Sequence, residues 1–587
     1  MTGPRYAIIL PRSSPVSGTS QTRIARIGLQ EPFLACLFQN PAALILGNVQ
    51  AISIGDPPKG TVLGRLFRKE EDRPCTALPP GEAAAILRSK GQWLIDRYWG
   101  DYVALLPGTT GEMLILRAPM GYLPAYCQQT DEVCLVASDI ALLEQLSGRR
   151  ATINREALAE HLAAPELGTA RTCLSGIREL AGGQCGRWAA SHWQEHSLWS
   201  PWTHVSSTSR SVVPKDAAVR LRSTVNRTIA ARTSAGEHAI LLLSGGLDSS
   251  IVAAGLSEAG RPFTALTMVT RDRGGDERRY AAMVAARLGI ELTDCPRRVE
   301  DVAFDRSDAG RLPRPGEHAF HQATRRAAET LAYRKGAGMI VHGGGGDNLF
   351  CSVRSVAPLL DYLRVHGLDK GFRNLADSMV HLTQAGLPLL VWHIAKRALF
   401  RRSRYRLASN CHFLASKVQQ DLGARIDHPW FRFPPRALEG SGAHIGSIAL
   451  AESLIQNLDI LRPIPSWPLL LSQPVVECCV GIPSWLWYDR GHDRALVRHA
   501  FADRLPEPVL WRSTKGAMDS FLVELFEASH AHLRTMLLDG LLAGLDLLDR
   551  DALHAALATN QPIDGATCND LLRLADAEAW ARSWSMR

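Results

Sequence analysis

The chain has 587 residues. Because globular domains typically contain roughly 100–200 residues, this length predicts at least two of them. Hydrophobic residues make up 46% and charged residues 21% of the sequence, which excludes a disordered, collagenous or coiled-coil protein. The net charge of +8 is spread over the whole chain and is too dilute to predict nucleic-acid binding.

The apolar runs are too short for a membrane span or a secretory signal. Leu387–Ile394 is interrupted by Trp392 and His393 and falls well short of the ~20 apolar residues that cross a bilayer. The N-terminal run Ala7–Leu10 is shorter than the apolar core of a signal peptide. We therefore expect a cytoplasmic protein that binds neither membrane nor nucleic acid. Its twelve cysteines contain no C-x-x-C pair, so we expect reduced cysteines in the core.

The first third of the chain has short apolar runs separated by Gly, Pro and polar residues, which predict an antiparallel sheet domain with few helices. A helix is expected over Asn154–His161, and the Ser-, Thr-, Trp- and Pro-rich segment Trp199–Ser211 reads as a linker. We place the domain boundary between residues 205 and 206, which gives domains 1–205 and 206–587. The expected strands include Ala43–Leu46, Tyr102–Leu106, Met113–Leu116 and Val133–Ala137.

After this boundary, strands alternate with helices, which is typical of an α/β domain with a doubly wound parallel sheet. Gly289 is expected to end the second of these helices. Beyond residue 350 the pattern is mainly helical. The expected strands are His238–Leu243, Phe263–Val269, Ile290–Asp294 and Met339–His342, and the expected helices are Ser249–Ala259, Asp276–Leu288 and Glu317–Lys335.

A phosphate-binding loop is predicted where the first of these strands meets its helix. The residues are Leu243-Ser244-Gly245-Gly246-Leu247-Asp248-Ser249. Glycines at a helix N-terminus expose backbone N–H groups to an anion. No Gly-Lys-Ser/Thr ending follows, so this is not the loop of the common P-loop hydrolases. A plain Gly turn is the alternative, but the Ser and Asp residues favour a nucleotide site in which Asp248 binds Mg²⁺.

A second glycine-rich loop follows the strand that ends at His342. Gly343 and Gly344 begin it, and Asp347 lies near its end. Ligands bind at the carboxyl ends of strands in a doubly wound sheet, so Asp248 and Asp347 are predicted to share one metal ion. A flexible hinge is the alternative, although a hinge does not need an acidic residue.

These two loops, in this order, resemble those of the asparagine-synthetase-like amidotransferases, with the SGGxDS loop of the ATP pyrophosphatase superfamily. The resemblance implies an Ntn-type, glutaminase-like α+β sandwich before the synthetase domain. That glutaminase uses an N-terminal Cys, whereas this chain begins Met1-Thr2-Gly3-Pro4, so a degenerate domain that does not use glutamine is implied. The N-terminal matches are Trp99–Tyr102, Arg117–Gly121, Pro124, Tyr126 and Ala137–Asp139.

The residue at position 344 indicates which branch of this family the sequence resembles most. Asparagine synthetases carry a Glu at this place and β-lactam synthetases a Tyr, so Gly344 leaves room for a larger nucleophile. The sequence is most similar to lasso-peptide macrolactam synthetases, which join the N-terminal amine of a leaderless precursor core peptide to an Asp or Glu side chain, releasing AMP and pyrophosphate. A leader peptidase and a leader-recognition protein are the implied partners. Further matches are Pro468–Glu477, Ile482–Trp485, Arg494–Phe501 and Ser513–Gly516.

The resemblance also implies residue roles. Lys515 would stabilise charge near the phosphates, and catalysis would depend on Lys515, Asp248, Asp347 and Glu277. Glu277 is either a ligand or a helix N-terminal residue that favours the dipole. Mg²⁺ would bind Asp248 and Asp347. The implied ATP-binding residues are Leu243, Ser244, Gly245, Gly246, Leu247, Asp248, Ser249, Leu266, Met268, His342, Gly343, Gly344 and Lys515.

Several alternatives stay open. Three aromatic and proline clusters, Trp430–Pro435, Pro463–Pro468 and Trp485–Tyr488, are either parts of a peptide groove or ordinary core and turns. A β-lactam-type synthetase and an ammonia-dependent asparagine synthetase are alternative enzymes, both disfavoured by Gly344. An inactive peptide-binding scaffold is the alternative of another class.

Overall fold

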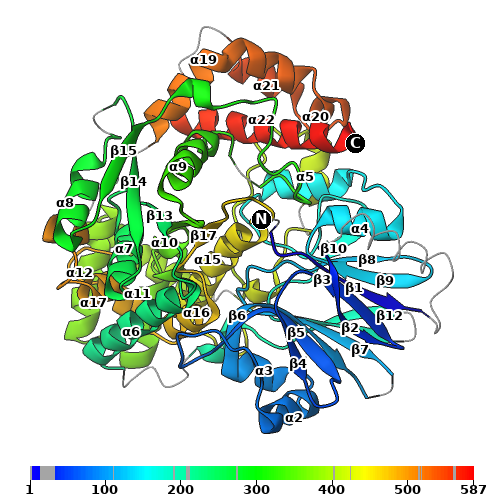
Figure 1. Cartoon of the computed structure of the whole chain (residues 1–587). Coiled ribbons are helices and arrows are strands. Elements are labelled where there is room, and N and C mark those ends of the chain that lie inside the picture. The colour runs from blue at the N-terminus through cyan, green and yellow to red at the C-terminus, as the bar shows by residue number, and fades with distance from the viewer. Residues whose placement is uncertain are drawn as a thin grey trace.

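The computed structural model describes residues 3–12, 33–109, 111–189, 192–205, 212–272, 275–316, 318–400, 403–422, 425–512, 516, 518–558 and 563–586. Two antiparallel sheets form one side of the molecule, a parallel sheet forms the other, and helices lie around and between them (Figure 1). Within the described residues, no helix is both long enough and apolar enough to span a bilayer.

The predicted antiparallel domain is confirmed as two six-stranded sheets packed face to face. Alternate residues of a strand point to opposite faces, so Ile8 and Leu10 pack between the sheets, while Ala7 and Ile9 face helices. The first sheet has the order β10 (Ile177–Glu179), β8 (Tyr126–Gln129), β9 (Val133–Ala137), β1 (Tyr6–Pro11), β3 (Ala43–Gly47), β2 (Ala35–Asn40). The second has the order β12 (His192–Ser197), β11 (Gln184–Ala189), β7 (Met113–Arg117), β6 (Tyr98–Pro107), β5 (Gly60–Arg68), β4 (Ala51–Ile54).

Helices cover the outer faces of both sheets. Helices α2 (Pro80–Arg88) and α3 (Gln92–Arg97) pack on the second sheet, and α4 (Ile140–Ser147) packs on the first. Helix α5 (Arg155–Ala163) begins one residue later than predicted because Asn154 is its N-cap, with Oδ1 accepting a hydrogen bond from the backbone N–H of Ala157. The α+β sandwich is thus observed, and its glutaminase-like character stays a prediction.

The prediction of a linker is wrong for its first part. Trp199 is buried, its indole Nε1–H donates to Glu477 at 3.0 Å, and Pro201–His204 forms the 3-10 helix η1. Residues 206–211 lie outside the described part of the chain. The segment is therefore packed against the second half of the molecule, and the placement of the boundary at 205 and 206 stays a prediction.

The doubly wound parallel sheet is confirmed. Its order is β15 (Leu292–Pro296), β14 (Phe263–Val269), β13 (Ala239–Leu242), β16 (Met339–His342), β17 (Ser466–Pro468). Ile240, Leu266 and Ile340 pack against α9 (His321–Lys335), and Leu241 and Val341 face α7 (Leu247–Glu258). Helices α6 (Pro214–Arg232) and α8 (Arg278–Leu288) complete that side, and Gly289 ends α8 with φ +66 as predicted.

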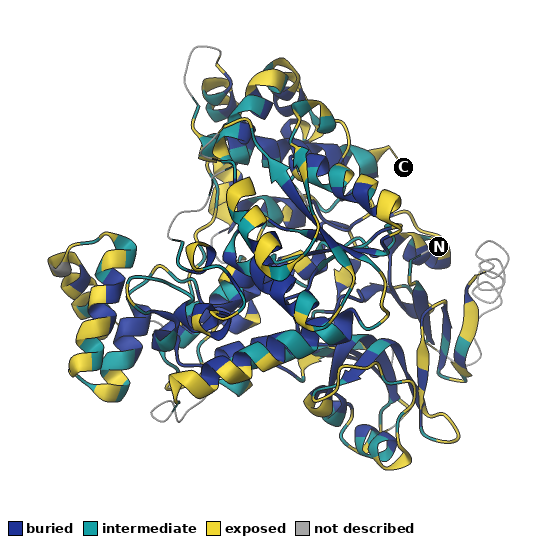
Figure 2. Cartoon of the chain, turned by 60° about the vertical axis from the view of Figure 1, so that its left-hand side comes forward, coloured by how far each residue is buried: buried dark blue, intermediate teal, exposed yellow. Residues whose placement is uncertain are grey.

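The remainder is mainly helical, as expected. The last helices return to the first half of the chain, where Leu571 and Trp580 share one core with Leu142 and Leu158. In Figure 2 the buried residues, in dark blue, lie mainly inside the molecule, and exposed residues, in yellow, lie on its outer helices and strands. The helices are α10 (Gly346–Leu349), α11 (Ala357–His366), α12 (Lys370–Thr383), α13 (Leu387–Leu399), α14 (Ser416–Leu422), α15 (Glu439–Gln456), α16 (Gln473–Val480), α17 (Ala495–Ala500), α18 (Glu507–Leu510), α19 (Asp519–Leu538), α20 (Leu541–Gly544), α21 (Arg550–Ala556) and α22 (Gly565–Ser585), with the 3-10 turns η3 (Val299–Asp301), η4 (Pro429–Phe431) and η5 (Ser484–Trp487).

A buried ion cluster also joins the two halves. Glu179 is fully buried and binds Nη1 of Arg117 at 2.6 Å and Nη1 of Arg314 at 2.5 Å. Arg117 lies on β7 of the antiparallel part, whereas Arg314 lies in the loop before α9. The two guanidinium groups share this one carboxylate, so removing Glu179 would leave both buried positive charges without their counter-charge.

Candidate active site

The first predicted loop connects β13 to α7 at the carboxyl end of the parallel sheet. Gly245 adopts φ +69, and a Cβ there would lie 2.7 Å from Cβ of Tyr280, so α8 packs directly on the loop. Ser249 Oγ accepts from the backbone N–H of Ser244 at 3.3 Å and donates to the carbonyl of Gly246. No side chain caps α7. Its first backbone N–H groups are therefore available to an anion.

The second loop lies against the first. A Cβ on Gly343 would be 2.6 Å from the backbone of Asp248 and Ser249, and one on Gly346 would be 2.4 Å from Cγ of Asp248. Only glycine permits this approach at both positions. Gly343 and Gly346 therefore allow the two loops to pack closely, and these contacts favour a binding site over a flexible hinge.

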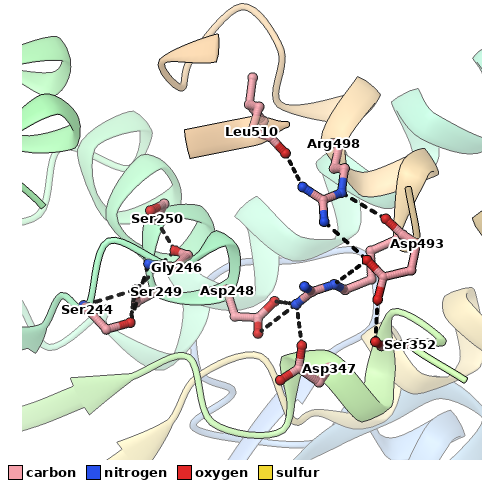
Figure 3. Close-up of polar contacts among 11 residues, drawn as sticks. Ser244, Gly246, Asp248, Ser249, Ser250, Asp347, Ser352, Asp493, Arg498 and Leu510 are labelled. Carbon is pink, nitrogen blue, oxygen red and sulfur yellow. Dashed lines mark hydrogen bonds and ion pairs between the residues drawn. The ribbon is translucent and has the colours of Figure 1, made fainter. Parts of the chain in front are cut away.

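Asp248 and Asp347 converge on one cation. Nη1 of Arg494 is 3.4 Å from the carboxylate oxygens of Asp248 and also contacts Oδ1 of Asp347. Figure 3 shows the two carboxylates directed toward each other from the first turns of α7 and α10. Burial lowers the pKa of Arg494, but the carboxylates of Asp248, Asp347 and Asp493 together raise it above its ordinary value. The guanidinium therefore stays charged between the aspartates.

This arrangement fits the predicted magnesium site. Mg²⁺ in nucleotide enzymes binds one or two carboxylates together with phosphate and water oxygens. Asp248 and Asp347 supply two carboxylates within reach of one cationic atom, and the side chain of Asp347 is 54% exposed. Among the described residues, no group of three or more His, Cys, Asp or Glu side chains forms a metal site. The protein would thus supply two ligands, and the rest would come from phosphate and water.

Glu277 lies at the N-terminus of α8, as one of its two predicted roles requires, and its role as a ligand stays a prediction. It is the N-cap residue of α8, but its side chain does not cap the helix. Instead, Oε1 accepts from the backbone N–H of Gly516 at 2.8 Å and pairs with Nη1 of Arg512 at 2.9 Å. Lys515 lies outside the described residues. Glu277 therefore contacts a residue on each side of Lys515 in the sequence, Arg512 before it and Gly516 after it.

The other predicted ATP-binding residues differ in how far their side chains are buried. Leu243 and Leu247 are buried and support the first loop, and Leu266 is buried against α9. Met268 is partly buried. His342 ends β16, and its Nδ1 accepts from the backbone N–H of Gly344 at 3.1 Å.

For two of the three aromatic and proline clusters, the structure favours the alternative of ordinary core. Trp430 and Phe431 are buried in the main core, as are Trp485, Trp487 and Tyr488. Their aromatic surfaces are therefore not available to a ligand. The third cluster, Pro463–Pro468, differs because Ile464 and Ser466 line a cavity.

This cavity has a volume of about 550 Å³ and lies beside the two loops. Its walls come from α5, α9, α15 and α22 and from the ends of β13 and β16. Leu454 on α15 is 39% exposed, and Asp576 on α22 also lines the cavity. Burial lowers the pKa values of His161 and His318 to about 3 and those of His321 and His342 to about 4. The four imidazoles of the lining are therefore uncharged at neutral pH, whereas other lining residues, such as Arg325 and Glu329, are of charged types.

Arg494 is a site residue to which the sequence analysis gave no role. It has φ +52 at the start of α17, a backbone conformation that is rare for a non-glycine residue. Its Nε also contacts Asp493 at 3.4 Å, and Asp493 pairs with Arg498 at 3.1 Å. The segment Arg494–Phe501 was among the sequence matches to the family. It contains no glycine-rich motif, so nothing in it singled out Arg494 as a site residue.

Comparison with known proteins identifies the family. The asparagine synthase family model matches residues 220–431 and 468–582, which together are more than half of the chain. The chain belongs to the asparagine synthase family. Members of the asparagine synthase family use ATP to form amide bonds, and both aspartates and both glycine-rich loops lie inside the matched residues.

Other comparisons add little to the family assignment. No curated protein matches the chain. One similar solved structure is the allosteric regulatory enzyme of purine biosynthesis, at 11% identity, with 50% of this chain and 75% of that chain covered and a TM-score of 0.19. Another is glutamine phosphoribosylpyrophosphate amidotransferase from B. subtilis complexed with ADP and GMP, at 12% identity, with coverages of 58% and 90% and a TM-score of 0.21.

Proposed function

We propose that this protein is an ATP-dependent lasso-peptide cyclase. It would activate an Asp or Glu side chain of a leaderless precursor peptide and join it to the peptide's N-terminal amine. The observation that carries the proposal is the cavity of about 550 Å³ beside the aspartate loops. Pockets of roughly 300–1,000 Å³ hold ligands of drug size, so this cavity is much larger than a free amino acid requires.

The first step would activate the carboxylate. A carboxylate oxygen of the peptide attacks the α-phosphorus of ATP, an O–P bond forms, and pyrophosphate leaves with the electron pair of the bond that breaks. Ser244, Gly245, Gly246 and Ser249 would hold the departing phosphates at the N-terminus of α7. Mg²⁺ bound by Asp248 and Asp347 would neutralise negative charge there when present.

The second step would form the amide. The amine nitrogen attacks the acyl carbon, AMP leaves, and the amine releases one proton to water. An α-amino group has a pKa of about 7.7–8.0, so a useful fraction is neutral near pH 7. Lys515 would stabilise charge near the phosphates, and Glu277 would position the segment that carries it. A leader peptidase and a leader-recognition protein would supply the leaderless peptide.

The test uses the full chain with ATP, Mg²⁺ and synthetic leaderless peptides encoded near its gene. We expect AMP formation that depends on the peptide and a product lighter than the peptide by one water. Formation of asparagine from aspartate and ammonia, without peptide cyclisation, would contradict the proposal in favour of an asparagine synthetase. A biological effect that survives Asp248→Asn would indicate a peptide-binding scaffold instead.

A further inference from the structure

The space beside Gly344 is occupied by the side chain of His342. A Cβ on Gly344 would lie 2.7 Å from Nδ1 and 2.8 Å from Cε1 of His342, and its next neighbour would be Leu454 Cδ1 at 3.7 Å. Any other residue at position 344 would therefore displace the imidazole. The expectation that Gly344 simply leaves open space is thus incomplete, because the imidazole takes the place of the missing side chain.

The hydrogen bonding of this imidazole defines where its proton lies. The backbone N–H of Gly344 donates to Nδ1 at 3.1 Å. Burial lowers the pKa of His342 to about 4, with Arg325 acting in the same direction, so the ring is neutral at pH 7. A neutral imidazole with an accepting Nδ1 carries its proton on Nε2. Within the described residues, no group accepts a hydrogen bond from Nε2.

The position of His342 relates the nucleotide loops to the cavity. It is the last residue of β16, and the residue that follows, Gly343, packs on the backbone of Asp248 and Ser249. His342 also lines the cavity together with Leu454 and Asn348. An acyl group attached to an α-phosphate held at these loops would enter the cavity beside the imidazole.

We propose that His342 is a catalytic hydrogen-bond donor whose Nε2–H binds the carbonyl oxygen of the activated peptide side chain. This role rests on the proposed cyclase function. When the amine attacks the acyl carbon, the C=O electron pair moves to oxygen, and Nε2–H stabilises that negative charge. The pair returns as AMP leaves. His342 remains neutral throughout and takes no proton from the amine, since Nδ1 is already bonded to the backbone N–H of Gly344.

Two substitutions separate this role from a structural one. In His342→Asn, the amide oxygen can replace Nδ1 as the acceptor for the N–H of Gly344, but no donor reaches the place of Nε2. In His342→Gln, the longer side chain can place an amide N–H near the place of Nε2. Removing one donor from an oxyanion site lowers kcat by roughly 10²–10³-fold. We therefore expect a loss of this size for His342→Asn and a loss within about tenfold for His342→Gln.

The measurements are single-turnover macrolactam formation, the KM for ATP, and the thermal midpoint of each variant. The KM for ATP should change little, since the donor contacts the acyl group. His554→Asn and His554→Gln are matched controls because His554 is exposed on α21. If His342→Asn is the more active variant, or if both lose activity equally while folded, His342 has a structural role and the proposal is overturned.

Failure of the proposed function has a different signature. A wild-type protein that forms no AMP in the presence of peptide would overturn both the cyclase function and the role of His342. A wild-type protein that cyclises its peptide, with the two His342 variants equally active, would overturn only the role of His342.

Discussion

The carboxylates of Asp248 and Asp347 contact the same guanidinium nitrogen, Nη1 of Arg494. The two residues lie in the first turns of α7 and α10, the helices that follow β13 and β16, so the parallel sheet itself places them together. Two carboxylates this close repel each other unless a cation lies between them. Arg494 supplies that cation, and a metal ion that binds both aspartates must compete with it.

Loss of either aspartate should abolish activation of the carboxylate. Charge stabilisation by a bound metal ion contributes several kcal/mol, which corresponds to at least about 100-fold in rate. We expect Asp248→Asn and Asp347→Asn each to lower peptide-dependent ATP–pyrophosphate exchange by this factor or more. Asp503→Asn is a control, since the side chain of Asp503 is 65% exposed and pairs with Arg222. Normal exchange in either site variant would show that the metal is held elsewhere.

Removal of Arg494 should change the response to magnesium. In Arg494→Gln, the aspartates lose their cation and repel each other, so we expect a lower thermal midpoint without metal. Mg²⁺ alone should then raise the midpoint of the variant more than that of the wild type, because no guanidinium competes for the carboxylates. Scanning fluorimetry over a Mg²⁺ series measures both effects, with Ca²⁺ as a second cation. An equal response of the two proteins would argue against a metal between Asp248 and Asp347.

Glu277 should act on turnover through the segment that it holds. Glu277→Ala removes the acceptor for Gly516 and the partner of Arg512, and misplacement of a catalytic group by about 1 Å costs roughly 100-fold. We expect kcat to fall by about this factor while the KM for ATP changes little. Glu277→Gln keeps an acceptor for Gly516 and should be less impaired. If both variants chiefly raise the KM for ATP, Glu277 is a nucleotide ligand after all.

Asp576 should make stability depend on pH. Burial raises the pKa of Asp576 to about 8, while the hydrogen bond from Ser307 opposes this rise. The folded protein therefore retains a proton that the unfolded chain releases near pH 4, so stability from this group is lost as the pH rises from about 4 to 8. Asp576→Asn stays neutral and keeps an acceptor for Ser307. Its thermal midpoint, relative to the wild type, should increase between pH 5 and pH 8.

Glu179 should be essential for stability. Glu179→Gln leaves the buried guanidinium groups of Arg117 and Arg314 without a counter-charge, and breaking such a buried pair costs about 3–5 kcal/mol. Urea unfolding measures this difference. Glu156→Gln is the matched control because Glu156 is 61% exposed in its pair with Arg171, and surface pairs contribute about 0–1 kcal/mol. A similar small loss in both variants would show that the cluster does not stabilise the junction.

Local sequence signals predicted the sheets and the loops well. Strands β14 and β16 have the predicted bounds, because each is an apolar run bounded by Gly, Pro or polar residues. Strand β15 lies further along than predicted, since the backbone N–H of Ile290 still bonds to Ala285 at the end of α8. Strand β17 was missed because three residues bounded by prolines carry no strand periodicity.

Long-range features could not be predicted in the same way. The role of Arg494 depends on a backbone conformation and on two loops far away in the chain. His318 and His321 are three residues apart, but His161 and His342 come from other elements, so no single spacing in the sequence groups all four cavity histidines. The sequence indicated Glu277 as a candidate residue whose role stays a prediction, and its contact with Gly516 follows only from tertiary packing.

The wall that α22 contributes to the cavity has a consequence for biosynthesis of the protein. The loops with Asp248 and Asp347 leave the ribosome long before Asp570, Arg573 and Asp576 are translated. Domains generally fold as units, and both loops belong with α22 to the predicted domain 206–587, so the nucleotide loops emerge while one side of the cavity is still missing. Full enclosure of the cavity must therefore wait until translation has passed α22.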